Sequence, residues 1–121
     1  MNVLLAIGRD GPRLALELLL SEEPGITILG AVSEAEGLLA LMRILCADLV
    51  VMEWSLPGRP AADVLAEARA LANQPKFLVL AQEAKLKQCV LQAGAAAFVL
   101  VGDPPERLLG SLRQVRAMLT R

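Results

Sequence analysis

The chain alternates short apolar runs with segments of helical periodicity. Five runs are dominated by consecutive apolar residues with no regular polar alternation, at 3–7, 26–32, 48–54, 76–81 and 96–101. Uninterrupted apolar runs of this length are typical of strands that are buried on both faces, as in a parallel sheet.

Helical patterns fill the intervals between these runs. The first covers about 13–20. The second follows Ser33 and Glu36, whose spacing predicts a capping box. The third is expected to start near Pro60, since proline is well placed in a first helical turn.

Two further helices are predicted toward the end of the chain. Gly94 is expected to stop the fourth, because glycine commonly follows a helix terminus. The fifth has Asp103 as its expected N-cap and Pro104 at its first helical position.

Strand and helix alternate five times, which predicts an α/β fold of (βα)5 type. Right-handed crossovers favour a flavodoxin-like three-layer sandwich with a five-stranded parallel sheet in the order 2-1-3-4-5. We expect residues 1–121 to form a single domain. The second strand would lie at an edge, and Gly30 is predicted to mark a bulge in it. Ligands of such sheets bind where the strands end, just after Ile7, Met52, Leu80 and Leu100.

Composition narrows the function classes. The 121 residues include 12 Lys and Arg against 13 Asp and Glu, so a basic nucleic-acid footprint is not expected. Histidine and tyrosine are absent, which removes the commonest general base and transition-metal ligand, and we do not expect an enzyme.

Cysteine usage and apolar run length bear on the compartment. Cys46 and Cys89 lie in apolar surroundings and are expected to be buried thiols in a reducing cytoplasm. No apolar run approaches the roughly 20 residues of a membrane helix. No basic segment precedes an apolar one at the N-terminus, so a secretory signal is not expected either.

Three stretches carry a specific resemblance, which extends over essentially the whole chain. The first is 3–5 leading through 24–30, the second is 47–58, and the third is 92–100 followed by 105–109. In these stretches the chain resembles a response-regulator receiver domain, most closely of the LuxR/NarL type.

This resemblance implies a particular chemistry. A receiver of that family transfers a phosphoryl group from a kinase histidine to its own aspartate. An acidic pair after the first strand and the acceptor after the third hold Mg²⁺ through oxygen ligands. A lysine after the fifth strand neutralises charge on the phosphoryl group, and a Ser or Thr after the fourth contacts it.

In this chain the family's positions carry other side chains. The acidic pair falls on Ile7 and Gly8, and the acceptor falls on Glu53, which is one methylene longer than aspartate. The hydroxyl, lysine and switch-aromatic positions fall on Ala81, Val101 and Phe98. We therefore predict a pseudo-receiver with no catalytic residue, no metal and no cofactor.

Two positions near this pocket leave alternatives open. Asp10 could replace the missing acidic pair, although an N-cap of the first helix is favoured. Glu53 is either a phosphomimic or a drifted position that turns to solvent or to an arginine. Burying a carboxylate among apolar side chains is costly unless it is paired, so we expect a partner in Arg9 or Arg59.

Remaining features have mostly structural interpretations. Trp54 is expected to pack rather than to bind a ligand, and the spacing of Gly8 and Gly11 is too loose for a nucleotide loop.

The last helix carries a group of arginines, at Arg107, Arg113, Arg116 and Arg121. They form either a solvated face or, with Leu109, an interaction face for a partner. The resemblance implies that a homodimer would use the fourth helix, fifth strand and fifth helix.

Three functions compete. The first is a signalling module that contacts a protein partner or itself without phosphorylation. The second is the regulatory domain of a LuxR/NarL-type transcription factor, which would carry its helix-turn-helix elsewhere; this chain itself is not expected to bind nucleic acid or membrane. The third is an enzyme or small-molecule binder that uses the crevice at the strand ends. The length of the native open reading frame distinguishes the first function from the second.

Overall fold

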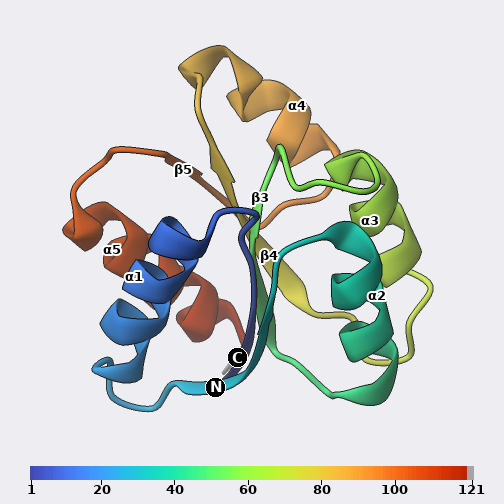
Figure 1. The fold of residues 1–121 in the computed structure, drawn as a ribbon, viewed down its shortest axis with the longest axis horizontal. Coiled ribbons are helices and arrows are strands. Elements are labelled where there is room, and N and C mark those ends of the chain that lie inside the picture. The colour runs from blue at the N-terminus through green and yellow to red at the C-terminus, as the bar shows by residue number, and fades with distance from the viewer. Residues whose placement is uncertain (120–121) are drawn as a thin grey trace.

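The chain folds as five strands that alternate with helices, here in a computed structural model that describes residues 1–119 (Figure 1). The strands are β1 Asn2–Ala6, β2 Thr27–Val32, β3 Leu49–Glu53, β4 Lys76–Ala81 and β5 Ala97–Leu100. The helices are α1 Asp10–Ser21, α2 Ala35–Ile44, α3 Ala61–Ala68, α4 Lys87–Gln92 and α5 Pro105–Leu119, with a short 3₁₀ turn, Ala84–Leu86, before α4.

All strands are parallel and lie in the order β2-β1-β3-β4-β5, which confirms the predicted flavodoxin-like topology. The register between β1 and β2 shifts after Val3, because Val3 pairs with Ile28 whereas Leu4 pairs with Gly30. Leu29 is the extra residue, so the predicted bulge lies beside Gly30 on this edge strand.

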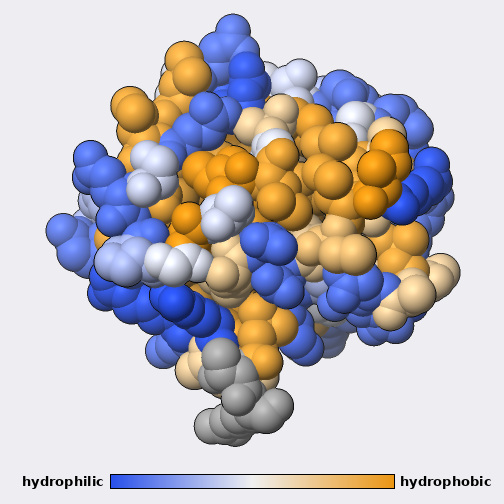
Figure 2. All heavy atoms as spheres, turned by 90° about the horizontal axis from the view of Figure 1, so that it is seen from below, coloured by the Kyte–Doolittle hydropathy of each residue, from blue (hydrophilic) through white to orange (hydrophobic). Residues whose placement is uncertain are grey.

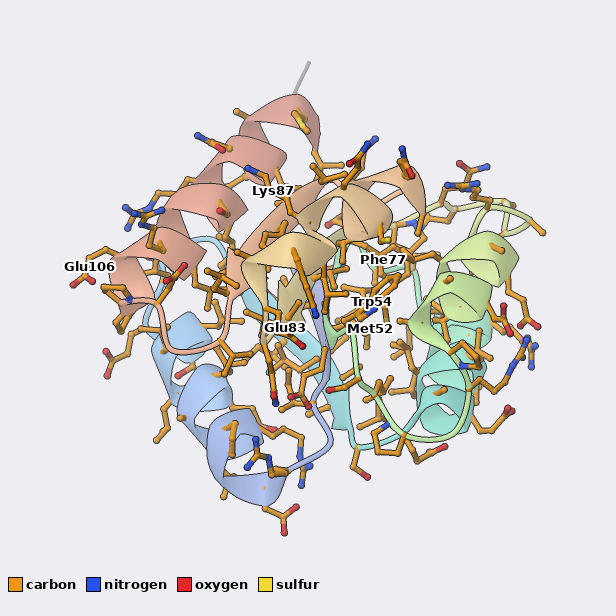
Figure 3. All side chains as sticks on the ribbon, turned by 90° about the horizontal axis from the view of Figure 1, so that it is seen from above. Met52, Trp54, Phe77, Glu83, Lys87 and Glu106 are labelled. Atoms are coloured by element: carbon orange, nitrogen blue, oxygen red, sulfur yellow. The ribbon has the colours of Figure 1, made fainter. Side chains whose placement is uncertain are left out.

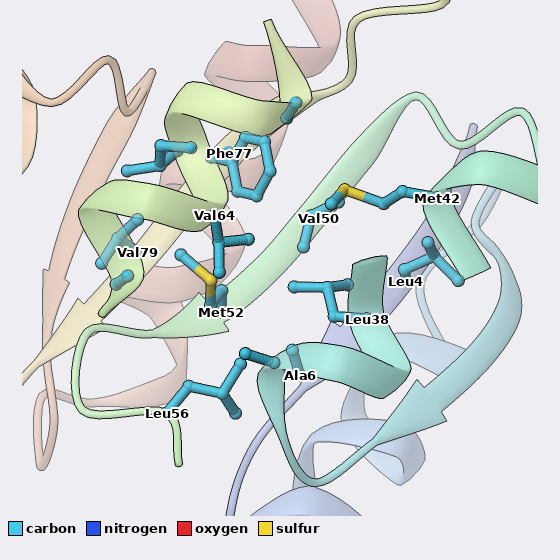
Figure 4. Packing of buried hydrophobic residues seen from close by; sticks show 14 of the residues in the cluster. Leu4, Ala6, Leu38, Met42, Val50, Met52, Leu56, Val64, Phe77 and Val79 are labelled. Atoms are coloured by element: carbon cyan, nitrogen blue, oxygen red, sulfur yellow. The ribbon is translucent and has the colours of Figure 1, made fainter. Parts of the chain in front are cut away.

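Alternation along the strands divides the core into two clusters. In β1, Leu4 belongs to one cluster and Leu5 to the other; in β3, Met52 and Val51 divide in the same way. The first, the α2–α4 cluster, packs against α2, α3 and α4, and Figure 4 shows part of it. The second, the α1–α5 cluster, packs against α1 and α5.

Figure 1 shows the resulting layers, with α1 and α5 on one side of the sheet and α2 and α3 on the other. Each strand residue therefore has a side of the sheet set by its position along the strand. This rule decides which side chains can meet where the strands end.

The start of α2 differs from its prediction. The capping box of Ser33 and Glu36 is wrong: Glu34 is the N-cap, and its carboxylate accepts hydrogen bonds from the N–H groups of Glu36 at 2.8 Å and Gly37 at 2.7 Å. Each of the two carboxylate oxygens accepts from a different N–H group, so one side chain satisfies two of the free helix donors.

The starts of α1 and α5 are also shifted. Asp10 is not an N-cap: it lies in the first turn of α1 and pairs with Arg13, while Arg9 occupies the cap position without a side-chain hydrogen bond. The last helix begins at Pro105, one residue later than its expected start at Pro104.

Both cysteines are exposed, so the expectation of buried thiols is wrong for Cys46 and Cys89. Cys46 lies in the loop after α2, and Cys89 lies on an exposed side of α4. Several large apolar side chains are exposed as well, and Figure 2 shows apolar surface gathered on the face seen from below. Within residues 1–119, no helix is long and apolar enough to cross a membrane.

Candidate functional site

The carboxyl ends of the central strands present one row of side chains toward α1 and α5. Glu53 pairs in register with Leu80, and Leu80 pairs with Val99. Ile7 follows Ala6, which pairs with Met52, so Ile7 lies beside Glu53. Alternation sends all four side chains to the same side of the sheet. Glu53 is the charged member of this otherwise apolar row.

The carboxylate of Glu53 is held by the main chain. Its Oε1 accepts a hydrogen bond of 2.6 Å from the N–H of Gly8, in the loop between β1 and α1. A Cβ at position 8 would lie only 3.0 Å from Cδ of Pro57, in the loop after β3. A side chain at position 8 would press on Pro57, so glycine favours the close approach of these two loops.

The expected pair between Glu53 and an arginine is wrong. Arg59 instead forms an ion pair of 2.7 Å with Glu67 of α3, and this hydrogen bond lowers the pKa of Glu67 and raises that of Arg59. Arg9 is exposed and forms no ion pair among the described residues. A main-chain donor supplies the partner that we expected from a cation.

The structure separates the other predicted pocket positions. Val101 and Glu53 both line a cavity between the sheet, α1 and α5, and Val101 is 47% exposed. Ala81 is buried and does not line that cavity. Phe98 points to the other face of the sheet, where it packs against the α2–α4 cluster. The six positions therefore do not form a single pocket.

Trp54 packs, as its interpretation predicts. Its side chain is half-buried against the α2–α4 cluster, and its main-chain N–H donates to the carbonyl of Leu80 at 2.7 Å. Figure 3 shows Trp54 with Met52 and Phe77 on the α3 side of the sheet. Trp54 is thus next to Glu53 in sequence but on the opposite face of the sheet.

A cavity of about 390 Å³ lies between α1, α5 and the row that contains Glu53. Its lining is mostly apolar, and its charged members are Arg9, Glu53 and Asp103. Sequence reasoning placed a crevice at the strand ends but did not assign it to this side. The alternation of side chains along the strands, which puts Ile7 and Glu53 on the same side of the sheet, is the signal that could have shown this.

The predicted interaction face on α5 is partly engaged within the chain. Arg113 binds both carboxylate oxygens of Glu23, at 2.9 and 3.2 Å, and Arg116 donates to the carbonyl of Pro24 at 2.9 Å. The bond from Arg113 lowers the pKa of Glu23. Leu109 is half-buried against the α1–α5 cluster.

Arg107 is exposed, whereas Arg121 lies outside the described residues. Whether this face binds a partner therefore stays a prediction. A partner would have to compete with the contacts of Arg113 and Arg116 or leave them in place.

Comparisons with known proteins agree with this fold. No family model matches the chain. It is 27% identical over 117 residues to the response regulator UvrY of Escherichia coli K12, covering 95% of this chain and 54% of that protein. It is 28% identical over 107 residues to the nitrate/nitrite response regulator protein NarL of the same strain, covering 87% and 50%. The chain thus spans about half the length of these relatives.

Solved structures match over nearly the whole chain. The response regulatory domain of protein mrkE from Klebsiella pneumoniae has a TM-score of 0.88 at 13% identity, and the match covers 98% of this chain and 97% of that one. A structure of two RcsB dimers bound to two parallel DNAs has a TM-score of 0.88 at 17% identity, covering 97% and 60%. By sequence and fold together, the chain is a response-regulator receiver domain of the LuxR/NarL type.

Proposed function

We propose that this receiver domain acts in two-component signal transduction through protein contacts that do not require its own phosphorylation. The observation that carries the proposal is the state of Glu53. Its carboxylate occupies the acceptor position that the family resemblance assigns, and it is bound to the Gly8 N–H rather than set among other acidic groups.

The donor set does not fit the Mg²⁺ of the family. Mg²⁺ needs near-octahedral oxygen coordination, usually from one or two carboxylates. The positions of the acidic pair are Ile7, which is buried with an apolar side chain, and Gly8, where a Cβ would press on Pro57. Among residues 1–119, no group of three or more His, Cys, Asp or Glu is placed to hold a metal ion.

The groups that would handle a phosphoryl group are replaced as well. Ala81 has no hydroxyl to contact it, and Val101 has no charge to neutralise it. Without a cation or a lysine, negative charge that develops during transfer would have no compensating partner on these positions. This supports an output that is independent of acyl-phosphate formation.

Trp54 offers a direct test, because its indole packs immediately after the acceptor position. Mg²⁺ and then beryllofluoride are titrated while Trp54 fluorescence is followed in the wild type and in Glu53→Asp, which restores the family's acceptor alone. We expect no saturable change in either protein. A saturable Mg²⁺ response, or one that appears only with beryllofluoride, would overturn the proposal.

For the partner, a second copy of the chain is the simplest candidate. The RcsB structure contains dimers, and the family resemblance implies a dimer through α4, β5 and α5. Exposed apolar side chains support such a contact: Leu91 on α4, Val101 directly after β5, and Met118 on α5. Sedimentation equilibrium of the wild type and of Leu91→Glu tests it. A dimer that the substitution dissociates is expected, and a concentration-independent monomer would contradict it.

A second candidate is the regulatory half of a DNA-binding regulator. The observation that favours it is that UvrY and NarL, both response regulators, are about twice as long as the matching region. The RcsB structure includes DNA. The native open reading frame, and a gel-shift assay on its full product with this domain alone as control, discriminate the two candidates.

A further inference from the structure

The cavity between α1 and α5 has the size of a ligand site. Its volume is about 390 Å³, and ligand pockets commonly fall between roughly 300 and 1,000 Å³. Apolar side chains from four elements supply most of its wall, among them Leu16, Leu80, Val99 and Leu108. Such a lining favours a compact apolar group over a polar one.

The charged groups at this cavity favour a cation. The lining includes two carboxylates, Glu53 and Asp103, and one guanidinium, Arg9, so it carries a net negative charge. One carboxylate oxygen of Glu53 accepts the hydrogen bond from the Gly8 N–H, and Glu53 is half-buried, whereas Arg9 is exposed to water. Water screens the exposed charge of Arg9 more strongly than the half-buried charge of Glu53. The carboxylate of Glu53 therefore decides which ligand charge the cavity favours.

We propose that this cavity is a binding site for a small amphipathic amine, with its apolar body between α1 and α5 and its ammonium group on the carboxylate of Glu53. The ammonium group would donate to Glu53 in a charge-assisted hydrogen bond. The assignment depends on the cavity alone and holds whatever protein the domain contacts.

Three probes of the same shape test the assignment: 4-phenylbutylamine, 4-phenylbutanol and 4-phenylbutanoate. Binding to the full chain is followed by ¹H–¹⁵N chemical-shift changes, which also locate the probe. We expect the amine to bind roughly tenfold more tightly than the alcohol, with the carboxylate weakest, as one charge-assisted hydrogen bond would produce. The shifts should centre on Gly102 and on α1 near Ala15.

Two variants separate shape from charge. Ala15→Leu extends a side chain into the cavity and should weaken all three probes about tenfold or more, whereas Ala62→Leu, on the exposed side of α3, should leave them unchanged. Glu53→Gln keeps an oxygen for the Gly8 N–H but removes the charge. It should abolish the preference for the amine over the alcohol and leave alcohol binding in place.

The outcomes decide the proposal directly. Absence of saturable shifts with every probe overturns it, as do shifts located away from the cavity. Tightest binding by 4-phenylbutanoate would mean that Arg9 sets the charge selection, which also overturns it. Equal effects of Ala15→Leu and Ala62→Leu would show that the probes do not enter the cavity.

Discussion

The two faces of the sheet differ in what lies beside the ends of the central strands. On the α2–α4 face, buried side chains of three helices meet the sheet, and both Trp54 and Phe98 pack against this cluster. On the α1–α5 face, a cavity of about 390 Å³ remains where the strands end, beside Glu53. Alternation along the strands places the acceptor position, Glu53, on the face that has this cavity.

The largest expected effect contrasts one buried leucine on each face. Leu38 of α2 is fully buried in the α2–α4 cluster, and Leu108 of α5 is buried but lines the cavity. We expect Leu38→Ala to lower the free energy of unfolding by about 4 kcal/mol and Leu108→Ala by about 2 kcal/mol, because a side chain beside a void has fewer contacts to lose. Urea denaturation measures both, and equal losses would contradict the difference between the faces.

Filling the cavity on the α1–α5 face should stabilise the protein. Ala15→Leu adds apolar volume at the cavity and should raise the free energy of unfolding by about 1 kcal/mol. Ala62→Leu, at an exposed position of α3, serves as the matched control and should change it by less than about 0.5 kcal/mol. Urea midpoints at constant slope give the comparison. A destabilised Ala15→Leu would mean that the space is not accessible to a leucine side chain.

Helix capping differs between the faces too. Glu34 caps α2 with two hydrogen bonds, whereas Arg9 at the start of α1 makes no side-chain cap. Glu34→Ala should lower the free energy of unfolding by about 1 kcal/mol, and Arg9→Ala by less than about 0.5 kcal/mol. Thermal unfolding monitored by circular dichroism distinguishes them, and the reverse ranking would refute the assignment of the cap.

The smallest effect concerns the ion pair between Arg113 of α5 and Glu23 in the loop after α1. The hydrogen bond from Arg113 lowers the pKa of Glu23 below its ordinary value of 4.5. Its stabilisation is therefore complete above pH 4.5 and is lost as the pH falls through the lowered value. The stability difference between the wild type and Glu23→Gln should be present at neutral pH and shrink in acid, and it should be small because the pair is screened by solvent. A pH-independent difference would contradict it.

Much of the fold could be predicted because it depends on periodicity. The strand Lys76–Ala81 agrees with its prediction to the residue, and the strand order follows from right-handed crossovers. Helix starts were less predictable. Glu34 caps α2 because its side chain can reach back to two N–H groups, and the Ser33–Glu36 spacing carries no sign of that choice.

The candidate site likewise has features that the sequence predicts and features that it does not. The residue types at positions 7, 8 and 53 indicate which charged groups are missing, and the sequence alone is sufficient for that. The partner of Glu53 was not predictable from side chains, because it is the main-chain N–H of Gly8, brought close by a loop contact with Pro57. Likewise, a cavity is a property of packing between α1 and α5, which periodicity does not specify.

We propose that the carboxyl end of this sheet does not carry out phosphoryl transfer to Glu53. Intact-mass spectrometry of the protein after incubation with acetyl phosphate and Mg²⁺ measures this transfer. We expect the mass of the wild type to stay unchanged. A single added phosphoryl group that maps to Glu53 would contradict it.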